Sequence, residues 1–339
     1  MRNHFVEKSG ELLNDDGSLR EPGWSKRLVQ NYDRKKIKAN PLRIKEWDYY
    51  AVLSGDFGVA FTVSDLGFAG LHSVSFLDFR TPTETTKSVI TVLPLGKTNM
   101  PSTSETGDVH FSNKDLTIDF IKTEGQRRIV CLYKNFIGCN EFKCDITLEE
   151  PMMDTMVIAT PWKEKKTAFY YNQKINCMRA SGWVSLNGNT YEFNPETDFG
   201  TLDWGRGVWT YDNTWFWGSG NCDLNGHAFG FNIGYGFGDT TAASENILFY
   251  DGVAHKLDDV EFHIPENYTD PWKITSSDGR FEMDFNPIID RSALMDFKAI
   301  LSDQHQVFGK MTGKAVLDDG TVLEIKDMLC FAEKVHNKY

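Results

Sequence analysis

The chain has 339 residues, 40% of them hydrophobic and 25% charged, which is the balance of a globular protein with a sizeable buried core. Its net charge of -12 opposes binding to a phosphate backbone, so we expect no nucleic-acid partner. The densest basic run, from Asp33 to Lys45, is better explained as a solvated connector than as a contact with nucleic acid or anionic lipid.

The first residues lack the apolar segment of a signal peptide, and no apolar run approaches the roughly 20 residues that span a bilayer. We therefore expect a cytoplasmic protein without an integral membrane segment. The six cysteines include no CxxC pair, and the closest two, Cys139 and Cys144, have no histidine near them. In a reducing compartment such cysteines are mostly small buried hydrophobes, and we expect neither a structural zinc ion nor another cofactor.

Residues 1–40 form a polar lead-in with the turn signals "NDDGS" and "EPGW", and Trp24 is expected to pin this arm against the body. From Trp47 onward the chain is typical of many short strands. Residues 116–121 alternate between apolar and mixed positions, which is the period of a half-buried strand. The segment "SALMDFKAILS" (292–302) is the best candidate for a helix.

Two segments near residues 251 and 319 show strand, Asp-Gly turn and strand, which indicates hairpins. The sequence therefore predicts a mostly β fold of two antiparallel modules, barrels or sandwiches, packed together. We expect an N-terminal arm at 1–40, a first module at 41–180 and a second at 181–339. The oligomeric state stays open.

The segment "AFGFNIGYGFG" (228–238) has bulky apolar residues at odd positions, while its even positions are nearly all glycine, with one amide at Asn232. Each glycine inside a strand costs roughly 0.5–1 kcal/mol relative to alanine, so this face needs a reason. Close approach of another backbone is the more economical explanation. The alternative is room for a ligand oriented by Asn232, with Tyr235 on the strand's apolar face as a further substrate-binding candidate.

The segment "TLDWGRGVWTYDNTWFWGSG" (201–220) holds four of the nine tryptophans. Burial of each such ring removes about 150–250 Å² from water, so Trp215 and Trp217 are adequately explained as core. Function must then come from polar neighbours, of which Asp203 and Arg206 are the first candidates. A pair between them requires that the glycines beside Arg206 bend the strand.

Five segments together resemble a bacterial family, domain-of-unknown-function family 2804, over almost the whole chain. They are "LLNDDGSLREPGW", "RIKEWDYY", "DWGRG", "FNIGYGFGD" and "ENILFYDGVAHKL". This resemblance brings little function with it.

An acid followed by Trp-Gly and then Trp-x-Trp is similar to the second-domain motif of two-domain lipocalin-like proteins, among them carotenoid hydratases, tocopherol cyclases and some Diels–Alder-type cyclases. The resemblance implies two calycin-like barrels and an apolar pocket, often at the domain interface. Asp203 takes the place of the acid, and Trp215 with Trp217 that of Trp-x-Trp. The histidine that precedes the acid in some members is missing, because residues 200–202 read Gly-Thr-Leu.

The leading hypothesis is a cofactor-independent hydratase, isomerase or cyclase that acts by acid catalysis on a small apolar or unsaturated substrate. Asp203 would be the proton donor, since burial beside tryptophans raises the pKa of a carboxyl group. Arg206 would be its partner or a clamp for a substrate anion. We expect the substrate-binding residues to be Trp204, Trp215, Trp217, Asn232 and Tyr235.

Two alternatives remain open. One is a non-catalytic binder of a lipophilic metabolite. The other is a carbohydrate-active enzyme that uses two carboxylates from the group Glu192, Glu196, Asp198 and Asp203. Glu46 and Asp48 in "EWDYY" are expected on a solvated edge, and the single histidines, His72 and His110 among them, are expected to be structural. No GxGxxG, P-loop, HExxH or GxSxG motif is present.

Overall fold

The computed structural model describes residues 3–296 and 300–339, which form β-strands, two short 3-10 helices and their connections. The predicted mostly β fold is confirmed. Within this part of the chain no helix is long and apolar enough to cross a membrane.

The first large sheet carries ten strands along its main path, and neighbouring strands are antiparallel. In spatial order they are β7 (Thr83–Val92), β6 (Ala69–Asp78), β5 (Phe57–Asp65), β4 (Ile44–Leu53), β15 (Phe199–Val208), β13 (Lys165–Leu186), β11 (Asn140–Glu149), β10 (Gln126–Ile137), β9 (Leu116–Thr123) and β8 (Val109–Ser112). Along β9 the alternating burial of its side chains confirms the predicted half-buried strand.

Three further strands extend this sheet beside β13, and an N-terminal arm lies against them. Trp24 in the arm is buried and pairs with Ile158, as the expected anchor should. The elements are β12 (Met156–Trp162), β14 (Asn189–Phe193), β2 (Gly23–Ser25), the parallel pair β1 (Gly10–Glu11) and β3 (Gln30–Asn31), and the 3-10 helices η1 (Arg34–Lys36) and η2 (Pro41–Arg43).

The second large sheet has nine strands, again antiparallel between neighbours. Both predicted Asp-Gly hairpins are confirmed in it, at β18/β19 and at β23/β24. In spatial order the strands are β19 (Val253–Lys256), β18 (Ile247–Tyr250), β17 (His227–Tyr235), β16 (Asp212–Leu224), β24 (Val322–Lys338), β23 (Leu301–Val316), β22 (Phe281–Asp296), β21 (Trp272–Ser276) and β20 (Val260–His263).

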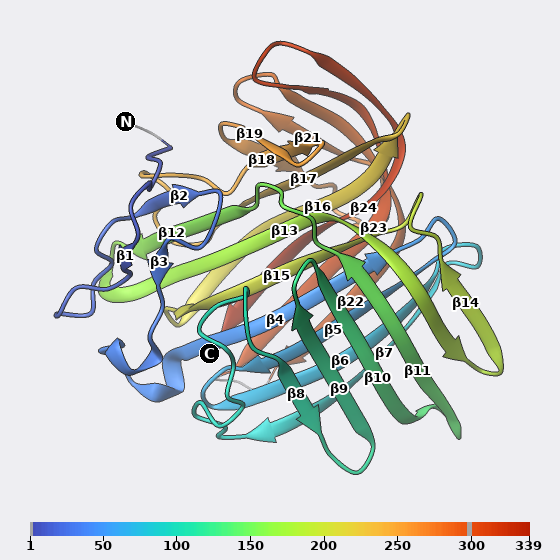
Figure 1. The fold of residues 1–339 in the computed structure, drawn as a ribbon, viewed down its shortest axis with the longest axis horizontal. Helices are drawn as coiled ribbons and strands as arrows, with labels where there is room; N and C mark the ends of the chain where they lie inside the picture. The colour runs from blue at the N-terminus through green and yellow to red at the C-terminus, as the bar shows by residue number, and fades with distance from the viewer. Residues whose placement is uncertain (1–2, 297–299) are drawn as a thin grey trace.

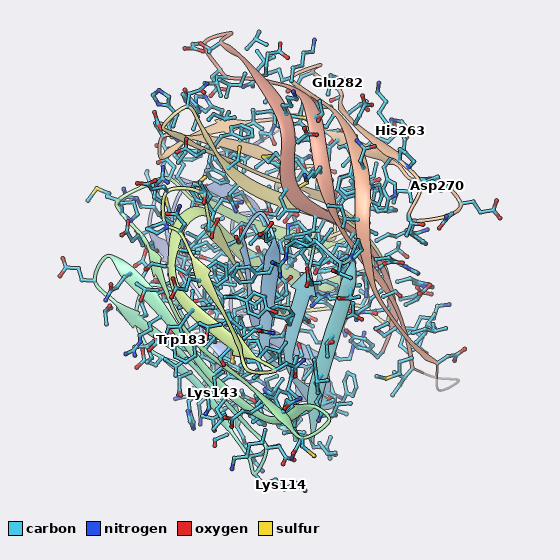
Figure 2. All side chains as sticks on the ribbon, turned by 90° about the vertical axis from the view of Figure 1, so that its right-hand side faces the viewer. Lys114, Lys143, Trp183, His263, Asp270 and Glu282 are labelled. Carbon is cyan, nitrogen blue, oxygen red and sulfur yellow. The ribbon has the colours of Figure 1, made fainter. Side chains whose placement is uncertain are left out.

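Each large sheet is curled into a half-barrel, as two lipocalin-like modules require. Figure 1 shows the orange and red strands of the second sheet above and behind the blue and green strands of the first. In Figure 2, Glu282 and His263 of the second sheet, and Asp270 in the connection from β20 to β21, lie at the opposite end from Trp183, Lys143 and Lys114. Strands β13 and β15 contact β16 and β17, so the sheets meet face to face there.

The helix predicted over residues 292–302 is wrong where the structure describes it. Ser292 to Asp296 continue β22, and Leu301 starts β23, with Asp296 paired to Leu301. Residues 297–299 lie outside the described part. A local apolar pattern is a weak signal, and here pairing with β23, itself paired to β24, decides the conformation.

The expected module boundary at residue 180 falls inside β13. The chain leaves the first sheet at Val208 and enters the second at Asp212. We propose to place the division between the modules in this short connection.

Candidate functional site

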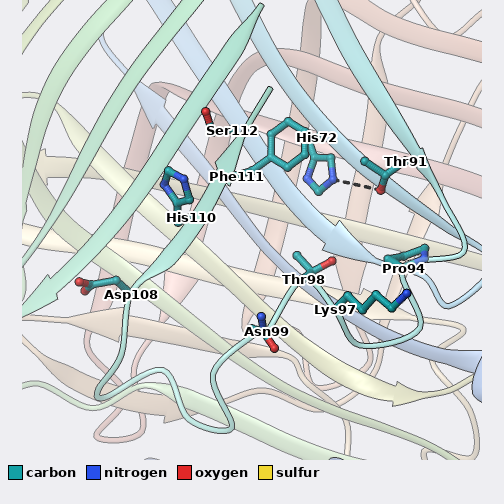
Figure 3. Close-up of a pocket in the computed structure, with 10 residues that line it drawn as sticks. All are labelled: His72, Thr91, Pro94, Lys97, Thr98, Asn99, Asp108, His110, Phe111 and Ser112. Atoms are coloured by element: carbon teal, nitrogen blue, oxygen red, sulfur yellow. Dashed lines mark hydrogen bonds between the residues drawn. The ribbon is translucent and has the colours of Figure 1, made fainter. Parts of the chain in front are cut away.

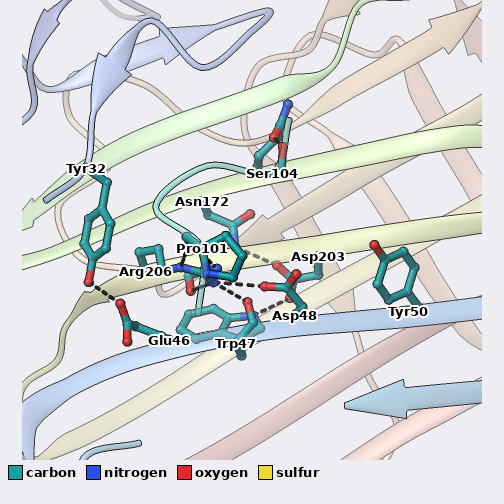
Figure 4. Close-up of polar contacts among 12 residues, drawn as sticks. Tyr32, Glu46, Trp47, Asp48, Tyr50, Pro101, Ser104, Asn172, Asp203 and Arg206 are labelled. Atoms are coloured by element: carbon teal, nitrogen blue, oxygen red, sulfur yellow. Dashed lines mark hydrogen bonds and ion pairs between the residues drawn. The ribbon is translucent and has the colours of Figure 1, made fainter. Parts of the chain in front are cut away.

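Strand β15 presents two chemically different faces, because successive side chains of a strand point to opposite sides. Asp203 points toward the second sheet, and its partners come from β13 and β4, the neighbours of β15 in the first sheet. Trp204 and Arg206 point the other way, into the interior of the first sheet. Figure 4 shows Asp203 with Asn172 and Trp47, and Arg206 with Asp48 and Pro101.

Asp203 is held by three donors at the interface between the sheets. The Lys174 ammonium lies 2.9 Å from Oδ1, and Asn172 Nδ2 donates to the same oxygen at 2.6 Å. Trp47 Nε1 donates to Oδ2 at 3.1 Å. The side chain of Asp203 is 10% exposed and that of Lys174 1%, so this is a buried ion pair. Lys174 Nζ also lies 3.9 Å from the ring centroid of Trp217, a cation–π contact.

The expected pair between Asp203 and Arg206 does not form. Arg206 Nη1 lies 3.1 Å from Asp48 Oδ1, and the guanidinium also donates to the backbone carbonyls of Pro101 and Trp47. Residues three apart face opposite ways in a regular strand, and β15 pairs with β4 in an uninterrupted register across its glycines. Gly205 instead makes room for the indole of Trp47, whose Cζ2 lies 2.0 Å from where a Cβ at Gly205 would be.

Glu46 and Asp48 are buried, so the expectation of a solvated edge is wrong. Tyr32 Oη donates to Glu46 at 2.7 Å, and Arg34 forms an ion pair with the same carboxylate. Burial raises the pKa of Asp48, and the guanidinium of Arg206 opposes that rise. The N-terminal arm thus covers charges that the strand pattern alone would leave in water. Buried side chains such as Asp48 and Arg206 fill this part of the inside of the first half-barrel.

Two glutamates that sequence reasoning missed flank the Lys174–Asp203 pair. Glu245, just before β18, accepts a hydrogen bond from Tyr170 Oη at 3.2 Å, and its Oε1 has no hydrogen-bond partner among the described residues. Burial raises the pKa of Glu245 to about 7, although Lys174 opposes the rise.

Glu333, on β24, is the second glutamate. It accepts hydrogen bonds from Trp215 Nε1 at 3.0 Å and from Gln306 Nε2 at 2.9 Å. Burial raises its pKa to about 7 as well. Both its oxygens have donors, whereas Glu245 keeps one oxygen free. Both glutamates with a raised pKa therefore interact electrostatically with the one Lys174–Asp203 ion pair.

Trp217 lies against Lys174, the partner of Asp203, and contacts Asn232, whereas Trp215 bonds to Glu333. Trp217 Nε1 donates to Asn232 Oδ1 at 2.7 Å, and Asn232 Nδ2 donates to the backbone carbonyl of Glu245 at 3.0 Å. Both halves of the amide are thus engaged by the protein. Asn232 holds Trp217 and Glu245 in place.

The structure does not bring Trp204 or Tyr235 to this place. Trp204 lies in the first sheet's interior, with the Arg206 guanidinium 4.2 Å from its ring centroid. Tyr235 lies on the opposite face of β17 from Asn232 and stacks on Phe216 at 4.5 Å. Burial in the second sheet's own core raises the pKa of Tyr235.

The glycine face of β17 is occupied by protein, and the atoms nearest to Gly230 and Gly234 belong to side chains, not to the close backbone expected from the sequence. A Cβ at Gly230 would lie 2.6 Å from Cys177 Sγ, and one at Gly234 would lie 2.4 Å from Glu245 Oε1. Real Cβ atoms do not approach so closely. The glycines therefore allow the two sheets to pack and let Glu245 sit against bare backbone.

Aromatic rings surround the polar cluster on the interface. Trp209 is contacted by Trp47, Trp162, Tyr170, Trp215 and Phe237, with ring centroids 5.1 to 6.3 Å away. Trp47 and Trp215 are only partly buried, so the cluster is not entirely closed. The interface is an apolar, low-dielectric setting for a few fixed charges.

The carboxylates proposed for a carbohydrate-active enzyme are not gathered at this interface. Glu192 and Glu196 are exposed. Asp198 accepts hydrogen bonds from its neighbours Asn194 and Thr197. Glu196 lines a separate surface hollow of about 630 Å³.

Comparison with known families and structures agrees with this architecture. The family described as domain of unknown function DUF2804 matches residues 3–339. The chain belongs to this family. No curated protein sequence is significantly similar to it.

Three crystal structures are similar to this DUF2804 protein. An AttH-like protein from Nitrosomonas europaea matches with a TM-score of 0.53 and 13% identity, covering 90% of this chain and 95% of the other. Kievitone hydratase from Nectria haematococca matches at 0.49 and 11%, covering 97% and 98%. CghA matches at 0.40 and 11%, covering 98% and 97%. Only the first exceeds 0.5, and it supports the two-sheet fold alone.

Proposed function

We propose that this protein is an acid–base enzyme of hydratase, isomerase or cyclase type that acts on a small apolar or unsaturated substrate between its two sheets. One observation carries the proposal: the Glu245 carboxyl, with a pKa near 7 and one unpartnered oxygen, lies beside the buried Lys174–Asp203 pair. A group that titrates at working pH can both give and take a proton.

In this proposal Glu245 is the proton donor. Both oxygens of Asp203 already accept hydrogen bonds from protein donors. We therefore assign to Asp203 the role of holding the Lys174 side chain in position, and not the proton-donor role that the sequence suggested. The ammonium of Lys174 would stabilise negative charge that develops on a substrate oxygen. Such fixed charges are effective because the surroundings are apolar and preorganised.

Glu333, Trp215 and Trp217 complete the proposed site. The two indoles supply apolar walls, and Trp217 also covers the ammonium of Lys174. Glu333 is the second group that can carry a proton near pH 7, held by Trp215. Arg206 supports the site from the other face of β15 through the backbone carbonyl of Trp47. A cofactor has no role in this proposal.

The first experiment is native mass spectrometry of freshly purified protein, followed by extraction and identification of any bound compound. Turnover of that compound is then compared in wild type, Glu245→Gln and Lys174→Met. Glu164→Gln, an exposed change in a turn, serves as the control. Loss of a general acid predicts a fall in kcat of roughly 100-fold or more for Glu245→Gln.

The pH profile adds a second readout. The contribution of Glu245 to the wild-type limb near pH 7 should be lost in Glu245→Gln, which leaves Glu333 as the other group with a pKa of about 7. Unchanged turnover in that variant would remove the proposed acid. A bound apolar compound that is never converted would favour a non-catalytic binder, and selective binding of oligosaccharides to the protein would overturn the apolar site.

A further inference from the structure

The first half-barrel has a seam where its strands stop pairing. Strands β7 and β8 are the two ends of the first sheet's main path, and each pairs on one side only, with β6 and β9 respectively. Thr91 of β7 and Phe111 of β8 nonetheless line the same surface hollow, of about 510 Å³. The hollow therefore occupies the seam, away from the sheet interface.

We call this feature the seam hollow. Its size is within the 300–1,000 Å³ of typical small-molecule sites. Figure 3 shows its ten lining side chains, among which the imidazole of His72 and the ring of Phe111 lie against each other. Their centroids are 3.6 Å apart and their planes nearly parallel. The lining residues are His72, Thr91, Pro94, Lys97, Thr98, Asn99, Asp108, His110, Phe111 and Ser112.

His72 is the first sign that the seam hollow is more than a gap. Its side chain is buried, and its Nδ1 has no hydrogen-bond partner among the described residues. Nε2 makes only a long contact of 3.4 Å to Thr91 Oγ1. A buried polar atom without a partner is costly in a native protein, so His72 leaves an unsatisfied polar group in the lining of the hollow.

The charges around the hollow favour a single negative charge. Lys97 contributes an ammonium, and Lys97 and Asn99 have no side-chain partner in the described part of the chain. Asp108 accepts a hydrogen bond from the backbone of Lys122, and His110 is engaged by Asp119. Lys97 is therefore the one lysine or arginine in the lining, and Asp108, bonded through one oxygen to the Lys122 backbone, is the one carboxylate.

A dianion fits the seam hollow less well. Burial lowers the pKa of His72 to about 4, so its imidazole is neutral at pH 7 and adds no positive charge. Asp108 lies on the wall, and the whole chain carries a charge of -12. A carboxylate matches one ammonium and one amide, whereas a phosphate monoester would bring a second, uncompensated charge.

Exposed apolar side chains continue from one edge of the seam hollow. Val92 is 80% exposed, Leu93 48% and Leu95 41%, and they flank Thr91 and Pro94 of the lining. Leu93 and Leu95 both have positive φ, 49° and 51°, which side chains with a Cβ rarely adopt. Strained, exposed leucines beside a polar hollow are the kind of feature that persists for a functional reason.

We propose that the seam hollow binds a small amphipathic carboxylate, its head group at Lys97 and Asn99 and its apolar part along Phe111, Pro94 and the exposed run from Val92 to Leu95. This site is separate from the interface of the proposed reaction. It is also separate from the interior of the first sheet, which buried charges such as Arg206 and Asp48 fill.

The test uses octanoate as the probe, with binding measured by calorimetry and located by amide chemical-shift changes in the full chain. Wild type should bind octanoate at least ten times more tightly than acetate, and more tightly than inorganic phosphate or octylamine. Lys97→Met should weaken octanoate binding at least tenfold. Lys273→Met, which removes an exposed lysine of β21, should leave it unchanged.

Three outcomes would overturn the proposal: equal octanoate affinity in Lys97→Met and wild type, tighter binding of phosphate than of octanoate, or shift changes centred on Trp217 and Lys174. Glu245→Gln separates this site from the proposed reaction, since it should abolish turnover and leave octanoate binding intact. Val92→Ser provides a second variant at an exposed position that should weaken octanoate but not acetate.

Discussion

Glu245 and Glu333 make the stability of this protein depend on pH in an unusual direction. Their pKa values are raised to about 7 in the folded state, against 4.5 as the ordinary value, because burial penalises the charged form. Between pH 4.5 and 7 the folded chain therefore binds more protons at these groups than the unfolded chain does. Their contribution to the free energy of unfolding is full below pH 4.5 and is lost as pH rises through 7.

The magnitude follows from the size of the pKa change. A rise from 4.5 to about 7 corresponds to about 3 kcal/mol for each carboxyl group, at roughly 1.4 kcal/mol per pKa unit. Both groups interact with Lys174 and Asp203, so their effects do not add independently, and we expect about 3–6 kcal/mol together. His72, with a pKa lowered to about 4, acts in the opposite sense between pH 4 and 6.5. The informative quantity is therefore the difference in the free energy of unfolding between wild type and a variant, measured as a function of pH.

The assay is urea unfolding of wild type and of the double variant Glu245→Gln, Glu333→Gln at pH 5, 6, 7 and 8. Glutamine mimics the protonated acid, so the two proteins should be similarly stable at pH 5. At pH 8 the double variant should be more stable by about 3–6 kcal/mol. Wild type then buries the negative charges of Glu245 and Glu333 in addition to that of Asp203, and the variant does not. Glu164→Gln, exposed, should show no such trend. A stability difference that is independent of pH would refute the reasoning.

Three further predictions concern buried pairs and packing. Lys174→Met should cost roughly 3–5 kcal/mol in urea unfolding by leaving Asp203 unpaired, and adding Asp203→Asn should recover part of that loss. Arg206→Met should cost a similar amount, read from the same urea curves. Gly234→Ala should cost about 1–3 kcal/mol, because its Cβ would meet a backbone oxygen at 2.6 Å. Gly55→Ala, with open space around it, should be neutral in thermal unfolding.

Local patterns in the sequence were sufficient for the strands and the turns. The alternation along β9 and the two Asp-Gly hairpins were readable, since each depends on neighbours in the chain. Trp24 was expected as an anchor, although its pairing with Ile158 joins distant segments. The glycine face of β17 was also readable as a packing feature. The helix expected near residue 292 failed because a local apolar pattern does not reveal that β23 is available as a neighbouring strand in the same sheet.

The candidate site was only half visible in the sequence. Asp203, Trp215 and Trp217 could be found because they stand in one motif. Lys174 and Glu245 could not, since they come from strands and loops far apart in the chain. The sequence did carry a signal for each residue. Lys174 stands beside the amides Asn172 and Gln173 in β13. Glu245 is the first residue of the family-like segment "ENILFYDGVAHKL".

The sequence by itself determined which residues face which side of each strand, because side-chain direction alternates with a period of two. The sequence did not determine which side chains form ion pairs with one another. Asp203 pairs with Lys174 and Arg206 with Asp48 because β15 lies between β13 and β4, an order that pairing between distant segments establishes. The pKa values near 7 at Glu245 and Glu333 likewise exist only once two sheets exclude water from both carboxyl groups.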